Sequence, residues 1–151
     1  MEKRVSCRAI IIDRDKLVAM YREKNNKVYY TFPGGGINEG ESETECVKRE
    51  CLEEFGIIVV PVRKLFILED AKTIQHYYLC NWTDGALGMG DGEEFSIGYD
   101  NGIYMPSLIP MSNVAKLPLV PSEIKDEVLA HYHNLFDDID EVKKIESSYN
   151  G

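Results

Sequence analysis

The stretch "GGINEGESETECVKRECLEEFGI" (Gly35–Ile57) carries the clearest local structure signals in the sequence, and it indicates where the main helix lies. Ser42 is followed three residues later by Glu45, which is the spacing of a capping box at a helix N-terminus. Gly56 suits the C-terminal cap, because glycine adopts the left-handed conformation without strain. These signals predict a helix over 43–55. One face of that helix is apolar and suited to packing on a sheet, at Val47, Cys51 and Phe55.

The same helix carries three glutamates on a neighbouring face. At roughly 100° per residue, Glu50, Glu53 and Glu54 lie within an arc of about 100°. Like charges at these spacings destabilise a helix by a few tenths of a kcal/mol per pair. A divalent cation would offset the repulsion, because Mg²⁺ prefers carboxylates together with water and substrate phosphates. A solvated acidic face is the alternative interpretation, and the spacing alone does not decide between the two.

The glycine-rich segment before the helix, "FPGGG" (32–36), is predicted to be a loop. Its glycines leave backbone amides and carbonyls without side chains in the way. A carbonyl of this loop could reach a metal ion, and its N–H groups could meet phosphate oxygens.

Length, composition and charge restrict the kind of partner. The chain has 151 residues and fits one domain, with a net charge of −9 that disfavours binding to a nucleic-acid polymer. A small phosphorylated molecule is compatible with this charge if a divalent cation lies between it and the protein. No apolar run approaches the length of about 18 residues that a membrane span needs. Four cysteines without C-x-x-C spacing indicate reduced thiols in a cytoplasmic protein.

The remaining sequence reads as strands and one further helix. A helix within 117–136 would be capped by Ser122, and the charged residues 137–151 are expected to fray. The segment 83–94 is rich in glycine and is predicted to be a loop. Strands are predicted over 4–13, 16–23, 28–32, 57–69 (as one or two strands around Pro61), 73–82 and 101–111.

The region around the helix resembles the Nudix box, G-x5-E-x7-R-E-U-x-E-E-x-G-U, in which U is a bulky apolar residue. Every fixed position is filled, and a pattern of this length is specific. Cys51 stands at the first U position and is smaller than the usual aliphatic side chain. The matching residues are Gly35, Glu41, Arg49, Glu50, Cys51, Glu53, Glu54, Gly56 and Ile57.

The resemblance implies an α/β fold, namely an α/β/α sandwich with a mixed β-sheet. The Nudix domain would cover 1–136, and 137–151 would form a charged tail. The implied activity is hydrolysis of a pyrophosphate bond in a nucleoside di- or triphosphate derivative, with Mg²⁺ or Mn²⁺ as cofactor. A sensor that binds nucleotides without cleaving them is the alternative, although such proteins commonly lose box glutamates. Family members are often dimeric, so a homodimer is also expected.

The resemblance also assigns roles to residues. The metal would be held by Glu50, Glu53, Glu54 and a backbone carbonyl at Gly34 or Gly35, while Arg49 and Glu41 would pair to hold the helix and the loop. The general base differs between family members, and the candidates here are Glu50, Glu53, and Glu93 or Glu94 in a distant loop. The catalytic candidates are therefore Glu53, Glu50, Arg49 and Glu94, and the candidate substrate-binding positions are Arg22, Gly34, Gly36 and Glu41. Arg22 is a candidate because it could touch a substrate phosphate from its strand, and an ordinary surface arginine is the alternative interpretation.

Overall fold

The computed structural model describes residues 2–88 and 102–147, and its strands form two mixed sheets. In the first sheet, β1 pairs in parallel with β7 and β10 pairs in parallel with β6, while the other pairs are antiparallel. From one edge to the other, its strands are β10 (Lys143–Glu146), β6 (Ile57–Glu69), β7 (Thr73–Gly85), β1 (Arg4–Ile10) and β5 (Gly34–Gly36).

The second sheet is built around the longest of its strands, β3, which pairs with three others. Tight turns with positive φ at Arg14–Asp15 and at Asn25–Asn26 join β3 to its neighbours, as two-residue hairpins require. The predicted first strand, 4–13, is therefore divided, because the chain leaves the first sheet at Ile11 and enters the second. The strands of this sheet are β2 (Ile12–Asp13), β3 (Lys16–Lys24), β4 (Lys27–Thr31), β8 (Ile103–Pro110) and β9 (Leu119–Val120).

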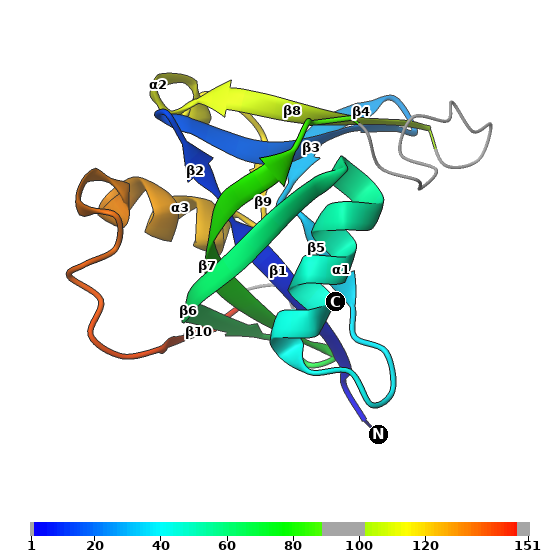
Figure 1. The fold of residues 1–151 in the computed structure, drawn as a ribbon, viewed down its shortest axis with the longest axis vertical. Helices are drawn as coiled ribbons and strands as arrows, with labels where there is room; N and C mark the ends of the chain where they lie inside the picture. The colour runs from blue at the N-terminus through cyan, green and yellow to red at the C-terminus, as the bar shows by residue number, and fades with distance from the viewer. Residues whose placement is uncertain (1, 89–101, 148–151) are drawn as a thin grey trace.

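Two helices, α1 (Glu43–Phe55) and α3 (Ser122–His131), lie on opposite sides of the strands (Figure 1). Each helix covers its own cluster of buried side chains. The apolar stripe of α1 packs on residues of β1, β3, β6 and β7, whereas Ile124 and Val128 of α3 pack on a second cluster that includes Phe32 and Tyr77. This arrangement confirms the predicted α/β/α architecture with mixed strand pairing.

The glycine segment differs from its prediction as a loop. Gly34–Gly36 forms β5, which pairs antiparallel with Arg8–Ser6 of β1 at the edge of the first sheet. Three consecutive glycines have low strand propensity, so local sequence could not reveal this pairing. The segment is consequently less bare than expected, because part of its backbone hydrogen-bonding capacity is used by β1.

The C-terminal part also differs from the sequence-based expectation. Ser122 is not the cap of α3: it is the first helical residue, Pro121 precedes it, and no side chain caps the helix. The tail that was expected to fray contains β10, which pairs with Phe66–Glu69. The short helices α2 (Met111–Val114) and η1 (Tyr132–Asn134) flank α3 along the chain. Within the described residues, no helix has the length and apolar character to cross a membrane.

Candidate active site

Arg49 is the centre of a network that joins α1 to the segment before it. Its Nε and Nη2 donate to the two carboxylate oxygens of Glu41 at 2.7 and 3.0 Å, which is a bidentate pair. Its Nη1 donates to Glu50 at 2.9 Å and to Glu53 at 3.2 Å, and Nη2 also donates to the Gly36 carbonyl at 3.0 Å. The predicted pairing of Arg49 with Glu41 is therefore present, and one guanidinium positions the helix relative to β5.

Glu41 is held ionised by this network. Hydrogen bonds from the Arg49 guanidinium and from the Asn38 backbone N–H lower the pKa of Glu41 from 4.5 to about 2. Because the pKa is lower in the folded state, the stabilisation is present above about pH 4.5 and declines as the pH falls towards 2. The same contacts favour the charged form of Arg49 and raise its pKa. The pair therefore stays charged across the neutral range.

The close approach of α1 to β5 depends on glycine. A Cβ at Gly35 would lie 2.7 Å from the carboxylate of Glu50, and the Gly34 N–H donates to Glu54 Oε1 at 3.2 Å. Gly34 has φ +144°, and a Cβ there would overlap the carbonyl oxygen of Cys7. The two glycines thus allow the carboxylates of α1 to lie against the edge strand.

A cavity of about 320 Å³, here called the arginine cavity, opens beside these carboxylates. Glu50 and Glu54 of α1 lie in its wall together with Gly34, Gly35 and Gly36 of β5. Three arginines from two other strands complete the polar part of the wall. They are Arg4 and Arg8 of β1 and Arg22 of β3.

The arrangement concentrates positive charge in a protein whose net charge is −9. Arg22 is held in place by Tyr104 of β8: its Nη2 donates to the Tyr104 hydroxyl at 2.6 Å, and its Cζ lies 3.9 Å from the centre of the ring. Arg8 Nη1 donates to the Phe32 carbonyl at 3.0 Å. Arginine recognises phosphate through several fixed N–H groups, so these residues suit an anionic ligand with more than one phosphate.

Comparison with known families and structures shows which proteins this chain is similar to. A family model of the NUDIX domain matches residues 2–97, which is more than half of the chain. This chain belongs to the Nudix family. No curated protein matches the chain.

Solved Nudix structures share the fold at low sequence identity. A NUDIX hydrolase from Nitrosomonas europaea aligns with a TM-score of 0.73 and 13% identity, covering 97% of this chain and 81% of the other. A MutT structure from a study of Aliivibrio salmonicida and Vibrio cholerae aligns with a TM-score of 0.68 and 16% identity, covering 87% of this chain and 100% of the other. An ADP-ribose pyrophosphatase from Streptococcus suis aligns with a TM-score of 0.63 and 18% identity, covering 97% of this chain and 100% of the other.

Only some of the glutamates of the Nudix box line the arginine cavity. Glu50 and Glu54 lie in the arginine cavity, whereas Glu53 has 54% of its side chain exposed and turns to Arg49. Glu41 is not among the residues that line the cavity, and its contacts are those of a positioning residue. The loop candidates Glu93 and Glu94 lie outside the described residues.

The donor set fits a hard divalent cation, which takes oxygen ligands. Two carboxylates and the backbone of β5 surround the same space, although the Gly35 carbonyl contacts the Cys46 thiol at 3.6 Å. Within residues 2–88 and 102–147, no three His, Cys, Asp or Glu side chains are grouped as a metal site. Glu50 and Glu53 both contact Arg49, and Glu53 would have to rotate towards Glu50 and Glu54 to share a metal ion with them.

Sequence reasoning missed Arg4, Arg8 and Tyr104 as members of this site. A signal for the arginines was present, since residues four apart on a strand point to the same face. The sequence did not show which site these two arginines would reach, because the pairing of β1 with β5 was not predicted. Tyr104 reaches the site through the pairing of β8 with β3, which places it directly opposite Arg22.

Proposed function

We propose that this Nudix protein is an Mg²⁺- or Mn²⁺-dependent hydrolase that cleaves a pyrophosphate bond in a nucleoside di- or triphosphate derivative. The observation that carries this proposal is the juxtaposition of Glu50 and Glu54 with three arginines in one cavity. Carboxylates suit a metal ion, and guanidinium groups suit phosphate oxygens. Two proteins of similar structure, an ADP-ribose pyrophosphatase and a UDP-X diphosphatase, are named for the same class of reaction, which supports the proposal.

In this proposal the arginines bind and orient the phosphates. Arg22 is fixed by Tyr104, and Arg8 by the Phe32 carbonyl, so both are preorganised before the ligand arrives. Arg4 lies close to Gly36 at the β5 side of the cavity. Because Gly36 has no side chain, nothing from this residue covers the Arg4 guanidinium.

Glu50, Glu53 and Glu54 would hold the metal, which when bound neutralises phosphate charge and lowers the pKa of a coordinated water. A carboxylate would accept the proton of the attacking water, and Glu50, Glu53, and Glu93 or Glu94 remain the candidates for this base. Arg49 contacts both Glu50 and Glu53, so it is a positioning residue for both acids, and release of Glu53 from Arg49 would let that carboxylate turn towards the cavity.

A panel of nucleoside diphosphate derivatives and nucleoside triphosphates, each incubated with the protein and Mg²⁺ or Mn²⁺, tests the proposal. We expect metal-dependent release of a nucleotide or phosphorylated product from at least one compound. Tight binding of one compound with no turnover of any would instead establish the sensor alternative. The intact set of box glutamates favours the enzyme.

A further inference from the structure

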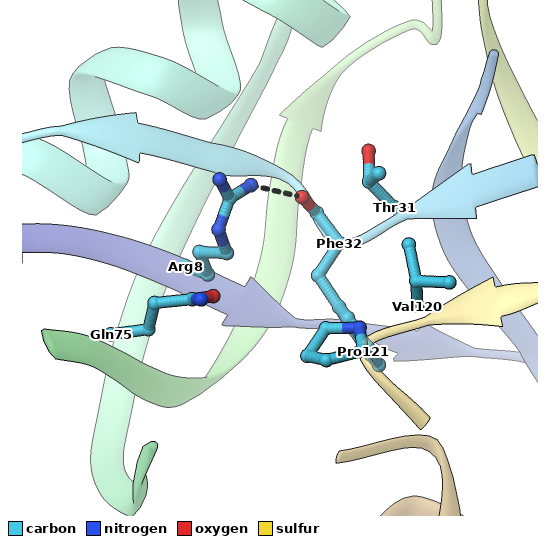
Figure 2. Close-up of a pocket in the computed structure, with 6 residues that line it drawn as sticks. All are labelled: Arg8, Thr31, Phe32, Gln75, Val120 and Pro121. Atoms are coloured by element: carbon cyan, nitrogen blue, oxygen red, sulfur yellow. Dashed lines mark hydrogen bonds between the residues drawn. The ribbon is translucent and has the colours of Figure 1, made fainter. Parts of the chain in front are cut away.

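A second cavity adjoins the first, and apart from Arg8 and the Phe32 carbonyl that holds it, its residues take no part in the chemistry above. It measures about 240 Å³ and is here called the Gln75 cavity, with Arg8, Thr31, Phe32, Gln75, Val120 and Pro121 as its lining residues (Figure 2). Three of these residues, Arg8, Thr31 and Phe32, also line the arginine cavity. The cavities therefore lie next to each other, so a ligand held by its phosphates in one could place its organic group in the other.

The walls of the Gln75 cavity differ in chemistry. Figure 2 shows the polar side chains of Arg8 and Gln75 on one side, and Thr31, Phe32, Val120 and Pro121 on the other, so the second wall is apolar except for the Thr31 hydroxyl. An apolar wall facing a few fixed polar groups is typical of a site for a flat organic group. The polar groups then decide which group is accepted.

The orientation of the Gln75 amide is set by a hydrogen bond from Tyr77. Tyr77, which is fully buried, donates its hydroxyl to Gln75 Oε1 at 2.7 Å. The ring of Tyr77 is itself fixed by edge-to-face packing on Phe32, with ring centres 5.6 Å apart. Because the Tyr77 hydroxyl donates to Gln75 Oε1, the amide cannot turn end for end without losing this hydrogen bond, and its NH₂ group keeps a fixed position.

Arg8 adds donors beside this NH₂ group. One of its nitrogens, Nη1, donates to the Phe32 carbonyl, and the guanidinium has further N–H groups but no acceptor. Gln75 and Arg8 together thus present hydrogen-bond donors to the cavity. A ligand edge made of acceptors would satisfy them, whereas an edge carrying an amino group would place donor against donor.

We propose that the Gln75 cavity binds the base of the nucleotide and that Gln75, positioned by Tyr77, selects bases that carry an oxo group over those with an amino group at the same position. This inference rests on the proposed function, because phosphates in the arginine cavity bring the base to its neighbour. An oxo oxygen accepts hydrogen bonds, while the exocyclic amino group of adenine or cytosine donates them.

Two pairs of ligands present this difference. Inosine and adenosine differ at the 6-position as oxo and amino, and uridine and cytidine differ in the same way at the 4-position. In each pair the adjacent ring nitrogen also changes, from an N–H donor in the oxo base to an acceptor in the amino base, so the variants below are needed to assign the preference to Gln75. The dissociation constants of their non-hydrolysable methylene diphosphates, measured with Mg²⁺, report binding without turnover. We expect the oxo member of each pair to bind roughly tenfold more tightly, because well-placed hydrogen bonds to a base edge discriminate against the wrong base by about this factor.

Two variants test the residues. Gln75→Glu replaces the NH₂ donor by an acceptor, so the oxo preference should disappear or reverse. Tyr77→Phe keeps the buried ring and removes only the hydroxyl, so Gln75 can turn either end to the ligand and the ratio should approach one. Asn81→Asp makes the same amide-to-acid change at an exposed position of the same strand, β7, and should leave the ratio unchanged.

Steady-state kinetics of the corresponding diphosphate derivatives separate specificity from general damage. Since the base is remote from the reacting phosphorus, Gln75→Glu should change KM for the oxo substrates while kcat stays within about twofold. Hydrolysis with equal KM for both members of each pair would overturn the base assignment and leave the proposed function standing. Selective binding without hydrolysis would overturn the proposed function and leave the base assignment standing.

Discussion

Glu54 contacts both the edge strand and the cavity, so a change at this residue should separate folding from activity. In Glu54→Gln, the amide oxygen can still accept the hydrogen bond that the Gly34 N–H donates at 3.2 Å. The negative charge that Glu54 would supply to a metal ion under the proposed function is lost. We expect unchanged circular dichroism and thermal unfolding, with hydrolysis reduced beyond roughly 100-fold, since even residues behind the ligands give 10- to 100-fold effects. Undiminished turnover would refute the role of Glu54.

Gly34 and Gly35 are adjacent, yet alanine should act differently at each. The Cβ of Gly35→Ala would meet the end of the flexible Glu50 side chain, which can move away, so stability should change little while hydrolysis falls. The Cβ of Gly34→Ala would meet the backbone of Cys7 at a positive φ, which should reduce the free energy of unfolding by about 1–3 kcal/mol. Urea unfolding and activity assays of both variants check this contrast, and equal stability losses would contradict it.

At the scale of elements, the start of α1 is fixed by its capping box. Glu45 N–H donates to Ser42 Oγ at 3.1 Å, and Ser42 N–H donates to Glu45 Oε1 at 2.9 Å. Ser42→Ala should therefore reduce the free energy of unfolding by about 1 kcal/mol and the melting temperature by about 2–4 °C. Ser42→Asp retains a capping oxygen and is the control. A melting temperature equal to that of the wild type in Ser42→Ala would show that the cap is dispensable.

Sequence predicted the elements whose signals are local. Helix α1 was predicted to the residue, because a capping box and a C-terminal glycine mark its two ends. Strands β5 and β10 were missed, because a glycine triplet and a charged tail gain strand structure only by pairing with distant segments. The candidate site divides in the same way. The Nudix box was readable, whereas the arginines reach the cavity through tertiary pairing.

At the scale of the whole molecule, β10 connects the C-terminal segment to the first sheet. Lys143 contacts Glu127 of α3, and the Ser147 N–H donates to the Glu69 carbonyl at 3.0 Å. Removal of 143–151 should reduce the free energy of unfolding by about 2–4 kcal/mol, at roughly 1 kcal/mol for each lost hydrogen bond. A chain ending at Ser147 keeps β10 and is the control. Equal urea midpoints for the two chains would restore the expectation of a frayed tail.

Other properties of the whole molecule stay predictions. The homodimer and the cytoplasmic location were expected from the family resemblance and from the unpaired cysteines. The four cysteines are buried and free, which agrees with reduced thiols. Sedimentation of the purified protein would measure its oligomeric state directly.

The contacts of Arg49 carry a consequence for how the protein responds to a chelator. This guanidinium is a built-in counter-charge for Glu41, Glu50 and Glu53, so the acidic helix is partly neutralised before any ion arrives. If the proposed metal dependence holds, EDTA should therefore abolish turnover while lowering the melting temperature by no more than a few degrees. Refilling with Mg²⁺ should restore the rate without a refolding delay. If calorimetry instead showed global unfolding on chelation, the metal ion and not Arg49 would be what stabilises the helix.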